Sequence, residues 1–134
     1  MSTFKNVEIT EDLYGVIGDY IVETGENDNG NYVKYNSGRL VMWGTKQFSG
    51  VDIYVRENNT MQMYNSIHMS LDFPMTSLTA CAVQLINCSR TGAFVSGSVT
   101  EDGFKSKAGF WFYHGTPIYD TDQCVHWLAI GTWK

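Results

Sequence analysis

Apolar and polar residues alternate along much of the chain, and the clearest case runs from Gly30 to Phe48. Residues 32–35 are strand-like, Asn36-Ser37-Gly38 has the composition of a tight turn, and an apolar run resumes over residues 39–43. Aromatic and β-branched residues favour strands, and glycine takes the positive φ that tight turns often require. This pattern predicts a β-hairpin.

The end of the chain has the same character as this hairpin. Residues 127–133, Trp-Leu-Ala-Ile-Gly-Thr-Trp, form an apolar run that resembles Trp43-Gly44-Thr45. A final strand of this kind can close a sheet that an early hairpin opens. We therefore expect the two segments to lie close together in one sheet region.

Alternation with a period of two predicts further strands. In residues 51–56 the apolar positions alternate with polar ones, and in residues 66–72 we expect Ile67, Met69 and Leu71 on one face and His68 on the other. Residues 80–88 are apolar at almost every position, which is typical of a central strand covered on both faces.

The most aromatic segment is predicted to be a strand that ends in four aromatic residues. A strand places Phe110 and Phe112 on one face and Trp111 and Tyr113 on the other. One pair should lie in the core. The other pair forms either a second buried layer or a surface platform.

Segments rich in turn residues are predicted to connect these strands. Residues 23–30 are expected to form a connecting loop, Glu101-Asp102-Gly103 a hairpin turn before Phe104, and residues 114–123 the longest irregular loop. A Ca²⁺ site at Glu26, Asp28 and Asn29 is a weak alternative, because the loop lacks the terminal glutamate of an EF-hand.

Residues 1–23 are predicted to form a short helix or an extended arm. Apolar residues recur there at helical spacing after a capping-like Thr10-Glu11-Asp12, whereas Gly15 and Gly18 weaken a helix. The apolar side of this segment either lies at a trimer axis or packs on its own domain.

Composition favours one packed domain that is rich in strands. The chain has 134 residues, 14% of them aromatic, with 13 glycines spread between short apolar runs. The predicted fold is all-β, an antiparallel β-sandwich over residues 24–134, preceded by the arm.

Charge and motif content argue against several classes of function. A net charge of −5 provides no basic stripe for nucleic acid. No apolar run reaches the length of a membrane span, and no secretory signal is present. Cys81, Cys88 and Cys124 match neither a zinc pattern nor a disulfide framework, so we expect buried thiols in a reducing compartment.

Known catalytic motifs are also missing from the sequence. There is no G-x-S-x-G, P-loop or H-E-x-x-H pattern, and a nucleophile pair of Cys124 and His126 is difficult to build in a buried strand. Asp120 and Asp122 could act as acid and base on a glycosidic bond, but two acids on a surface are more often solvated. We predict no enzyme activity, no catalytic residue, no metal and no cofactor.

A resemblance to a known family rests on several of these segments together. The series G-x-x-x-N-G-N-Y-V-K-Y-N-S-G-R-L-V-M-W-G, then Leu71-Asp72-Phe73-Pro74, Gly103-Phe104 and the terminal residues 126–131 resemble the C-terminal domain of bacteriophage tail-fibre and baseplate proteins. The layout is similar to the H-type lectin domain, and the resemblance covers residues 24–134.

The resemblance implies a domain of the virion tail that is assembled in the bacterial cytoplasm. It implies a homotrimer at a fibre tip that binds a host-surface glycan, with other phage tail proteins as partners. A structural tail or baseplate component without a ligand site is the alternative, and a glycan depolymerase is less favoured.

Candidate glycan contacts are chosen from residue type and predicted placement in loops. Sugars stack their C–H faces on aromatic rings and hydrogen-bond their hydroxyls to carboxylates and guanidinium groups. Trp111 and Tyr113 could equally be core residues, and the acids could cap loops. The candidates are Arg90, Asp102, Trp111, Tyr113, His114, Tyr119, Asp120 and Asp122.

Overall fold

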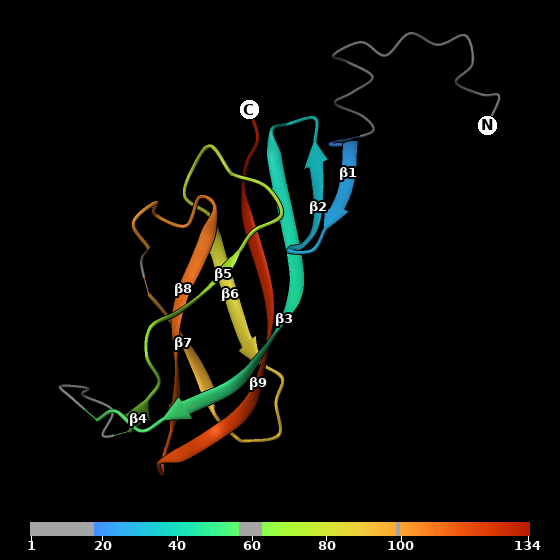
Figure 1. The fold of residues 1–134 in the computed structure, drawn as a ribbon. Coiled ribbons are helices and arrows are strands. Elements are labelled where there is room, and N and C mark those ends of the chain that lie inside the picture. Colours follow the sequence, from blue (N-terminus) through green and yellow to red (C-terminus); the bar gives the residue numbers. More distant parts are fainter. Residues whose placement is uncertain (1–17, 57–62, 99) are drawn as a thin grey trace, which may run out of the picture.

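The computed structural model describes residues 18–56, 63–98 and 100–134, and these residues form strands and no helix (Figure 1). The strands are β1 (Ile21–Asn27), β2 (Gly30–Tyr35), β3 (Arg39–Ile53), β4 (Tyr64–Asn65), β5 (Met69–Asp72), β6 (Ala82–Asn87), β7 (Phe94–Ser98), β8 (Lys107–His114) and β9 (Ile118–Thr132). The helix or arm predicted before residue 18 lies outside the described residues. Among the described residues, no helix has the length and apolar character needed to cross a bilayer.

The long strands β3 and β9 form the centre of a five-stranded antiparallel sheet with the order β1-β2-β3-β9-β6. The predicted hairpin is confirmed as β2 and β3, and Gly38 in its turn has a φ of 102°. The predicted contact between Trp43-Gly44-Thr45 and the last strand is also confirmed, because Gly44 pairs with Trp127.

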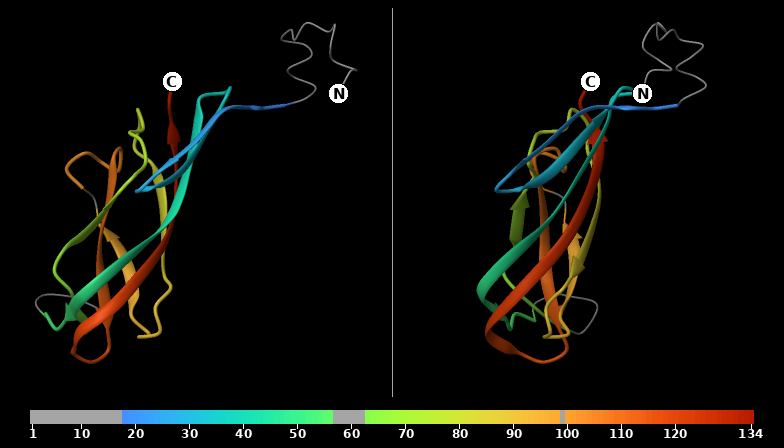
Figure 2. Two further views of the ribbon diagram at one scale, coloured as in Figure 1. Left: turned by 45° about the vertical axis from the view of Figure 1, so that its right-hand side comes forward. Right: turned by 90° about the vertical axis from the view of Figure 1, so that its right-hand side faces the viewer.

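A four-stranded antiparallel sheet packs on one part of the five-stranded sheet. Its central strand is β8, which pairs with β7 along one edge and with β4 and β5 along the other. Figure 2 shows that the β1–β2 hairpin leans away from this second sheet. The fold is therefore an all-β sandwich, as the alternation predicted.

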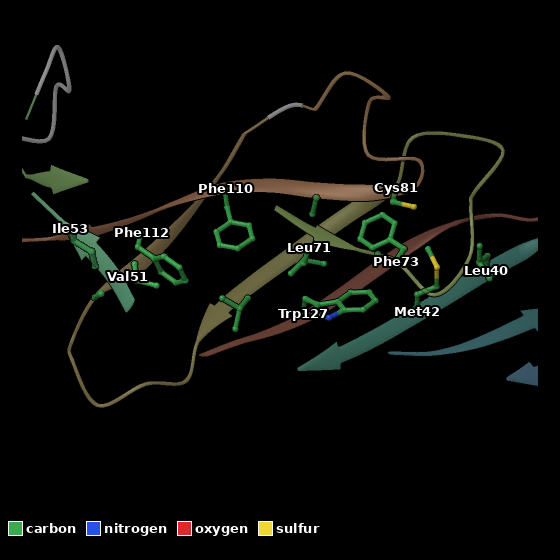
Figure 3. Packing of buried hydrophobic residues seen from close by; sticks show 14 residues of the cluster. Leu40, Met42, Val51, Ile53, Leu71, Phe73, Cys81, Phe110, Phe112 and Trp127 are labelled. Atoms are coloured by element: carbon green, nitrogen blue, oxygen red, sulfur yellow. The ribbon is translucent and has the colours of Figure 1, made fainter. Parts of the chain in front are cut away.

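The core lies between the two sheets and is filled mainly by one face of β8, β3 and β9 (Figure 3). Phe110 and Phe112 are fully buried and meet Phe48 edge to face, with ring centroids 5.6 and 5.8 Å apart. The opposite residues of β8, Trp111 and Tyr113, are half-buried on the outer side. The predicted division of the four aromatic residues between two faces is confirmed.

Close approaches explain two glycines of the long strands. The indole of Trp127 lies across Gly44, where an added Cβ would stand 2.9 Å from Nε1. At Gly131 an added Cβ would collide with the hydroxyl oxygen of Ser77. A side chain at either position would force a shift in a packed region. Trp-Gly and Ile-Gly in the sequence therefore mark strand positions that neighbouring groups cover.

Three predictions about local structure are wrong. Residues 23–30 are not a loop: β1 extends to Asn27, and a polar sequence suffices there because this edge strand is almost entirely exposed. Residues 80–88 do not form a central strand: β6 is the other edge strand, and its residue Ile86 is 53% exposed. Residues 114–123 are not a long loop, because β9 begins at Ile118.

The alternation predicted for residues 66–72 holds in part. Leu71 is buried and His68 points outward, but Ile67 is 69% exposed whereas Ser66 is buried. The hydroxyl of Ser66 donates to the carbonyl of Ile67 and accepts the amide N–H of Phe112. This local bonding turns the chain before β5 and reverses the expected faces of Ser66 and Ile67 only.

The connections between strands gather at the two ends of the sandwich. The start of β1 and the C-terminus lie at one end, whereas the β6–β7 and β8–β9 connections lie at the other (Figure 1). The imidazole Nε2 of His114 lies 3.0 Å from the carbonyl oxygen of Thr91, which joins these two connections. We call this second end, with residues 88–93 and 115–117 and the adjoining ends of β3 and β9, the distal end.

Candidate functional site

An irregularity in the β3–β9 ladder shapes the distal end. The register shifts between Phe48 and Val51, Gly50 has a φ of 64°, and Asp120 has a φ of 51°. Aspartate tolerates this left-handed conformation better than most residues, and here its amide N–H donates to a carboxylate oxygen of Asp52 at 2.8 Å. The extra residues form a bulge, and such bulges redirect side chains next to binding sites.

Beside this bulge, Tyr54 and Tyr119 form an exposed stacked pair. Their ring centroids are 5.7 Å apart with an interplanar angle of 29°. Tyr54 is 49% exposed and Tyr119 is 62% exposed, so both rings offer surface to solvent. We call these two residues the tyrosine pair. Exposed aromatic rings of this kind provide apolar faces with a polar hydroxyl at the edge.

A pocket of about 280 Å³ opens next to the tyrosine pair. Tyr54, Ile67 and Met69 supply apolar lining, and Asp52 supplies a carboxylate. Ser49, Gly50 and Val51 complete the lining. The pocket therefore combines an apolar wall with a few polar groups, which is the composition of small-molecule sites.

A second, more open pocket of about 520 Å³ also lies at the distal end. Its lining includes Arg90 and other residues of the β6–β7 connection, together with Asp122 of β9 and Gln47 of β3. Behind it, the buried Gln123 accepts hydrogen bonds at its Oε1 from Asn87, Ser89 and Thr91. The complete lining is Gln47, Cys88, Ser89, Arg90, Thr91, Thr121, Asp122, Gln123 and Cys124.

The disulfide between Cys88 and Cys124 corrects the prediction that all cysteines are free thiols. The two cysteines stand next to each other at the end of the β6–β9 ladder, where the Cys88 amide N–H donates to the Cys124 carbonyl. The spacing of 36 residues between the two cysteines did not indicate a disulfide, because the pairing of β6 with β9 brings them together and their distance in the sequence does not. Cys81 alone is a free buried cysteine among the described residues.

Five of the eight predicted candidates lie at the distal end. Arg90 and Asp122 share the open pocket, and Tyr119 and Asp120 lie at the tyrosine pair and the bulge. His114 lies nearby, but its ring is held between the carbonyls of Thr116 and Thr91. Its contacts therefore join connections at the distal end.

Three candidates lie apart from these pockets. Tyr113 stacks on Phe94 with ring centroids 5.5 Å apart, and Trp111 meets His68 edge to face at 5.0 Å. Both rings are partly covered by these neighbours. Asp102 belongs to the β7–β8 connection, which lies at the end opposite to the distal end (Figure 1).

Asp102 organises its own turn. Its carboxylate accepts hydrogen bonds from the hydroxyls of Ser106 and Thr100 and from the backbone amides of Ser106 and Lys105. These bonds, led by that from the Ser106 hydroxyl, hold the pKa of the Asp102 carboxyl well below its usual range. The hydrogen bonds to this carboxylate therefore come from its own turn.

Sequence reasoning missed Tyr54, Asp52 and Ile67 at the distal end. The alternation around residue 53 did predict that Asp52 and Tyr54 face outward, but an outward tyrosine in a strand is common. Their proximity to Tyr119 depends on the bulged ladder. The described residues contain no cluster of three or more His, Cys, Asp or Glu side chains suited to a metal ion.

Comparisons with known proteins identify similar folds. No protein-family model matches the chain, and the comparison with curated proteins finds no match. The C-terminal part of the R2 pyocin fibre of P. aeruginosa matches 92% of this chain with a TM-score of 0.52 and 15% sequence identity. This chain spans 30% of that fibre chain.

Fibres of R1 pyocins give further matches. An N-truncated R1-type pyocin tail fibre matches 94% of this chain, with 98% of its own length covered, a TM-score of 0.49 and 15% identity. The C-terminal part of the P. aeruginosa R1 pyocin fibre matches 93% of this chain, with 32% of its own length covered, a TM-score of 0.48 and 16% identity. At this level of identity, the likeness to the R2 fibre shows a shared fold.

Proposed function

We propose that this chain is a receptor-binding domain of a phage-type tail fibre, which binds a host cell-surface glycan as a homotrimer. The observation that carries the proposal is the exposed tyrosine pair beside an amphipathic pocket at the distal end. The fold shared with the R2 pyocin fibre supports the assignment to a tail fibre, with other tail proteins as partners.

The chemistry of the pocket beside the tyrosine pair suits a sugar. A pyranose ring can stack its C–H face on Tyr119 or Tyr54, while its hydroxyls bond to the carboxylate of Asp52 in the lining. The carboxylate of Asp120 lies beside Gly50 of the same lining and offers further acceptors. A volume of about 280 Å³ lies at the small end of ligand sites. The pocket therefore fits a single sugar unit within a longer chain.

The open pocket extends this surface with groups of both charges. Arg90 is exposed there and offers a guanidinium fork to an anionic substituent, and Asp122 offers hydrogen-bond acceptors. We also propose that the domain is similar to the H-type lectin domain, which its sequence resembles. Three weak sites on one rigid tip would raise avidity without a tight single site.

A structural tail component without its own ligand site is the second candidate. The packing of Trp111 on His68 and of Tyr113 on Phe94 favours it, because these rings are not free platforms. This candidate predicts that the tyrosine pair serves only the packing of the distal end.

In our proposal the domain has no catalytic role. Release of reducing ends from bacterial polysaccharide by the full chain would contradict this part of the proposal.

A glycan array probed with the full chain tests the proposal. Tyr119→Ala should lower binding by about 2- to 12-fold, because loss of one stacked ring costs about 0.5–1.5 kcal/mol and 1.4 kcal/mol corresponds to a factor of 10. Tyr20→Ala is the matched control, since Tyr20 is also an exposed tyrosine and precedes β1 at the other end.

The control variant should bind like the wild type, and both variants should still unfold cooperatively. Loss of the stack on Tyr54 should lower the melting temperature of Tyr119→Ala by only a few degrees. Equal binding by Tyr119→Ala and the wild type would exclude the tyrosine pair as the site. A wild type that binds no bacterial wall or capsule sugar would favour the structural candidate.

A further inference from the structure

The outward face of the five-stranded sheet carries a patch of apolar side chains. Cross-strand pairing aligns Val41, Ile130 and Ala82 in one row and Trp43 and Leu128 in the next. Ile86 follows along β6. Their neighbours along the strands, such as Met42 and Ala129, are buried, so these positions point away from the core. We call Val41, Trp43, Ala82, Ile86, Leu128 and Ile130 the outer face.

This composition is unusual for a sheet face in contact with water. Antiparallel sheets with one solvated face normally place polar residues there. Here Trp43, Ile130 and Leu128 are 41%, 41% and 37% exposed, and they adjoin one another across β3 and β9. Further along the same strands towards the distal end, the outward positions become polar, with Gln47 and Asp122. The apolar character is therefore confined to one part of the face.

The size of the outer face fits the centre of a protein interface. Three strands at about 4.8 Å spacing and six residues at about 3.4 Å rise give a footprint of roughly 300 Å². Apolar patches of this size on soluble proteins often mark interaction sites. A standard interface of about 800 Å² per partner has an apolar centre of this kind and a polar rim.

The absence of charge on this face indicates which partner it accepts. The outward positions of β3 from Val41 to Gln47, of β6 and of β9 from Cys124 to Ile130 carry no Asp, Glu, Lys or Arg. The one titratable group among them is the ring of His126, whose Nδ1 lies 2.7 Å from the hydroxyl oxygen of Thr45. A charged partner would lose solvation here without gaining a counter-charge.

A second copy of this chain meets these conditions. The chain has a net charge of −5, so two copies repel each other through most of their surface. A face without carboxylates lets them approach without burying like charges. Glu26 continues the row of Trp43 and Leu128 at the far strand β1, and Arg39 lies one outward position before Val41 on β3, so one charge of each sign lies at the rim. These features favour self-association over binding to an acidic or basic partner.

We propose that the outer face is the contact between copies of this chain. In this arrangement Trp43, Leu128 and Ile130 lie at the centre of the interface, and the tyrosine pair stays accessible at the distal end. That copies associate, and that they do so in threes, rests on the proposed function, whereas the assignment of the contact to the outer face rests on the chemistry of that face.

Sedimentation of the full chain at several concentrations tests this inference. The wild type should sediment as a multimer, and Leu128→Asp should sediment as a single chain with an unchanged far-UV spectrum, because the contact would have to bury a carboxylate without a counter-charge. Leu78→Asp is the matched control, since Leu78 is 61% exposed outside the outer face, and it should remain a multimer.

A second variant keeps the test decisive if Leu128→Asp does not fold. Gln84→Asp changes an exposed polar residue opposite Leu128 on an edge strand, and it should shift dissociation to at least about 10-fold higher concentration. Variants that keep the wild-type multimer mass would overturn the inference. A wild type that stays a single chain at every concentration would overturn both the inference and the homotrimer of the proposed function.

The outcome is separable from that of the proposed function. Tyr119→Ala should lose glycan binding while keeping the multimer mass. If the masses follow the expectation and no glycan binds, only the proposed ligand is wrong. If Tyr119→Ala loses binding but Leu128→Asp keeps its mass, only the assigned interface is wrong.

Discussion

Asp102 shows at the scale of a single residue how a carboxylate stabilises a turn. Hydrogen bonds from Ser106, Thr100 and Lys105 favour its ionised form, which is why its pKa is lowered. A lowered folded-state pKa adds stability above the unfolded value of about 3.9, and this stability declines as the pH falls towards the folded value.

Asp102→Asn should therefore be less stable than the wild type at neutral pH, and the difference should shrink as the pH falls below about 4. The amide has one acceptor oxygen in place of two and carries no charge that would be lost in acid. Urea unfolding at a series of pH values measures the difference in the free energy of unfolding. A difference that stays constant down to the acid limit would show that ionisation of Asp102 contributes nothing.

At the scale of elements, the disulfide joins the edge strand β6 to the central strand β9 next to the open pocket. The hydrogen bonds to Gln123 hold the same connection, so two independent constraints act on the residues around Arg90. This rigidity favours a preformed pocket over one that is ordered on binding.

Reduction of Cys88–Cys124 should lower the free energy of unfolding by up to about 4 kcal/mol, the chain-entropy estimate for cysteines 36 residues apart. Urea titrations with and without reductant measure this change. The effect should persist in Cys81→Ala, whose thiol is outside the disulfide, and vanish when Cys88 and Cys124 are both replaced by alanine. Three reactive thiols in the unfolded, unreduced protein would contradict the disulfide.

At the scale of the whole molecule, the apolar outer face and the polar distal end should respond differently to salt. Salt screens exposed charges and leaves the burial of apolar surface unchanged or strengthened. The separation of the two surfaces on one sandwich therefore gives a test that needs no mutation.

The multimer mass should remain unchanged when the salt concentration is raised to about 1 M, because no charged side chain lies within the outer face. Binding of an anionic glycan through Arg90 should weaken over the same range. Sedimentation and glycan binding in matched buffers measure the two responses. Dissociation of the multimer at high salt would place its contact on a charged surface instead.

The sequence by itself determined the strands whose pattern is local. Period-two alternation identified β8 with its two aromatic faces, and turn chemistry identified the β2–β3 hairpin, because side-chain direction and φ preference depend only on near neighbours. It also indicated that Trp43-Gly44 and the last strand meet, since two apolar strands need partners in one sheet.

Only the tertiary structure decided which strands lie at the edges, which cysteines pair and which residues share the distal end. The edge position of β6, the Cys88–Cys124 bond and the stacking of Tyr54 on Tyr119 all join residues at least 36 positions apart or depend on strand order. Sheet order and register bring such groups together, and neither is encoded in the alternation of a single strand.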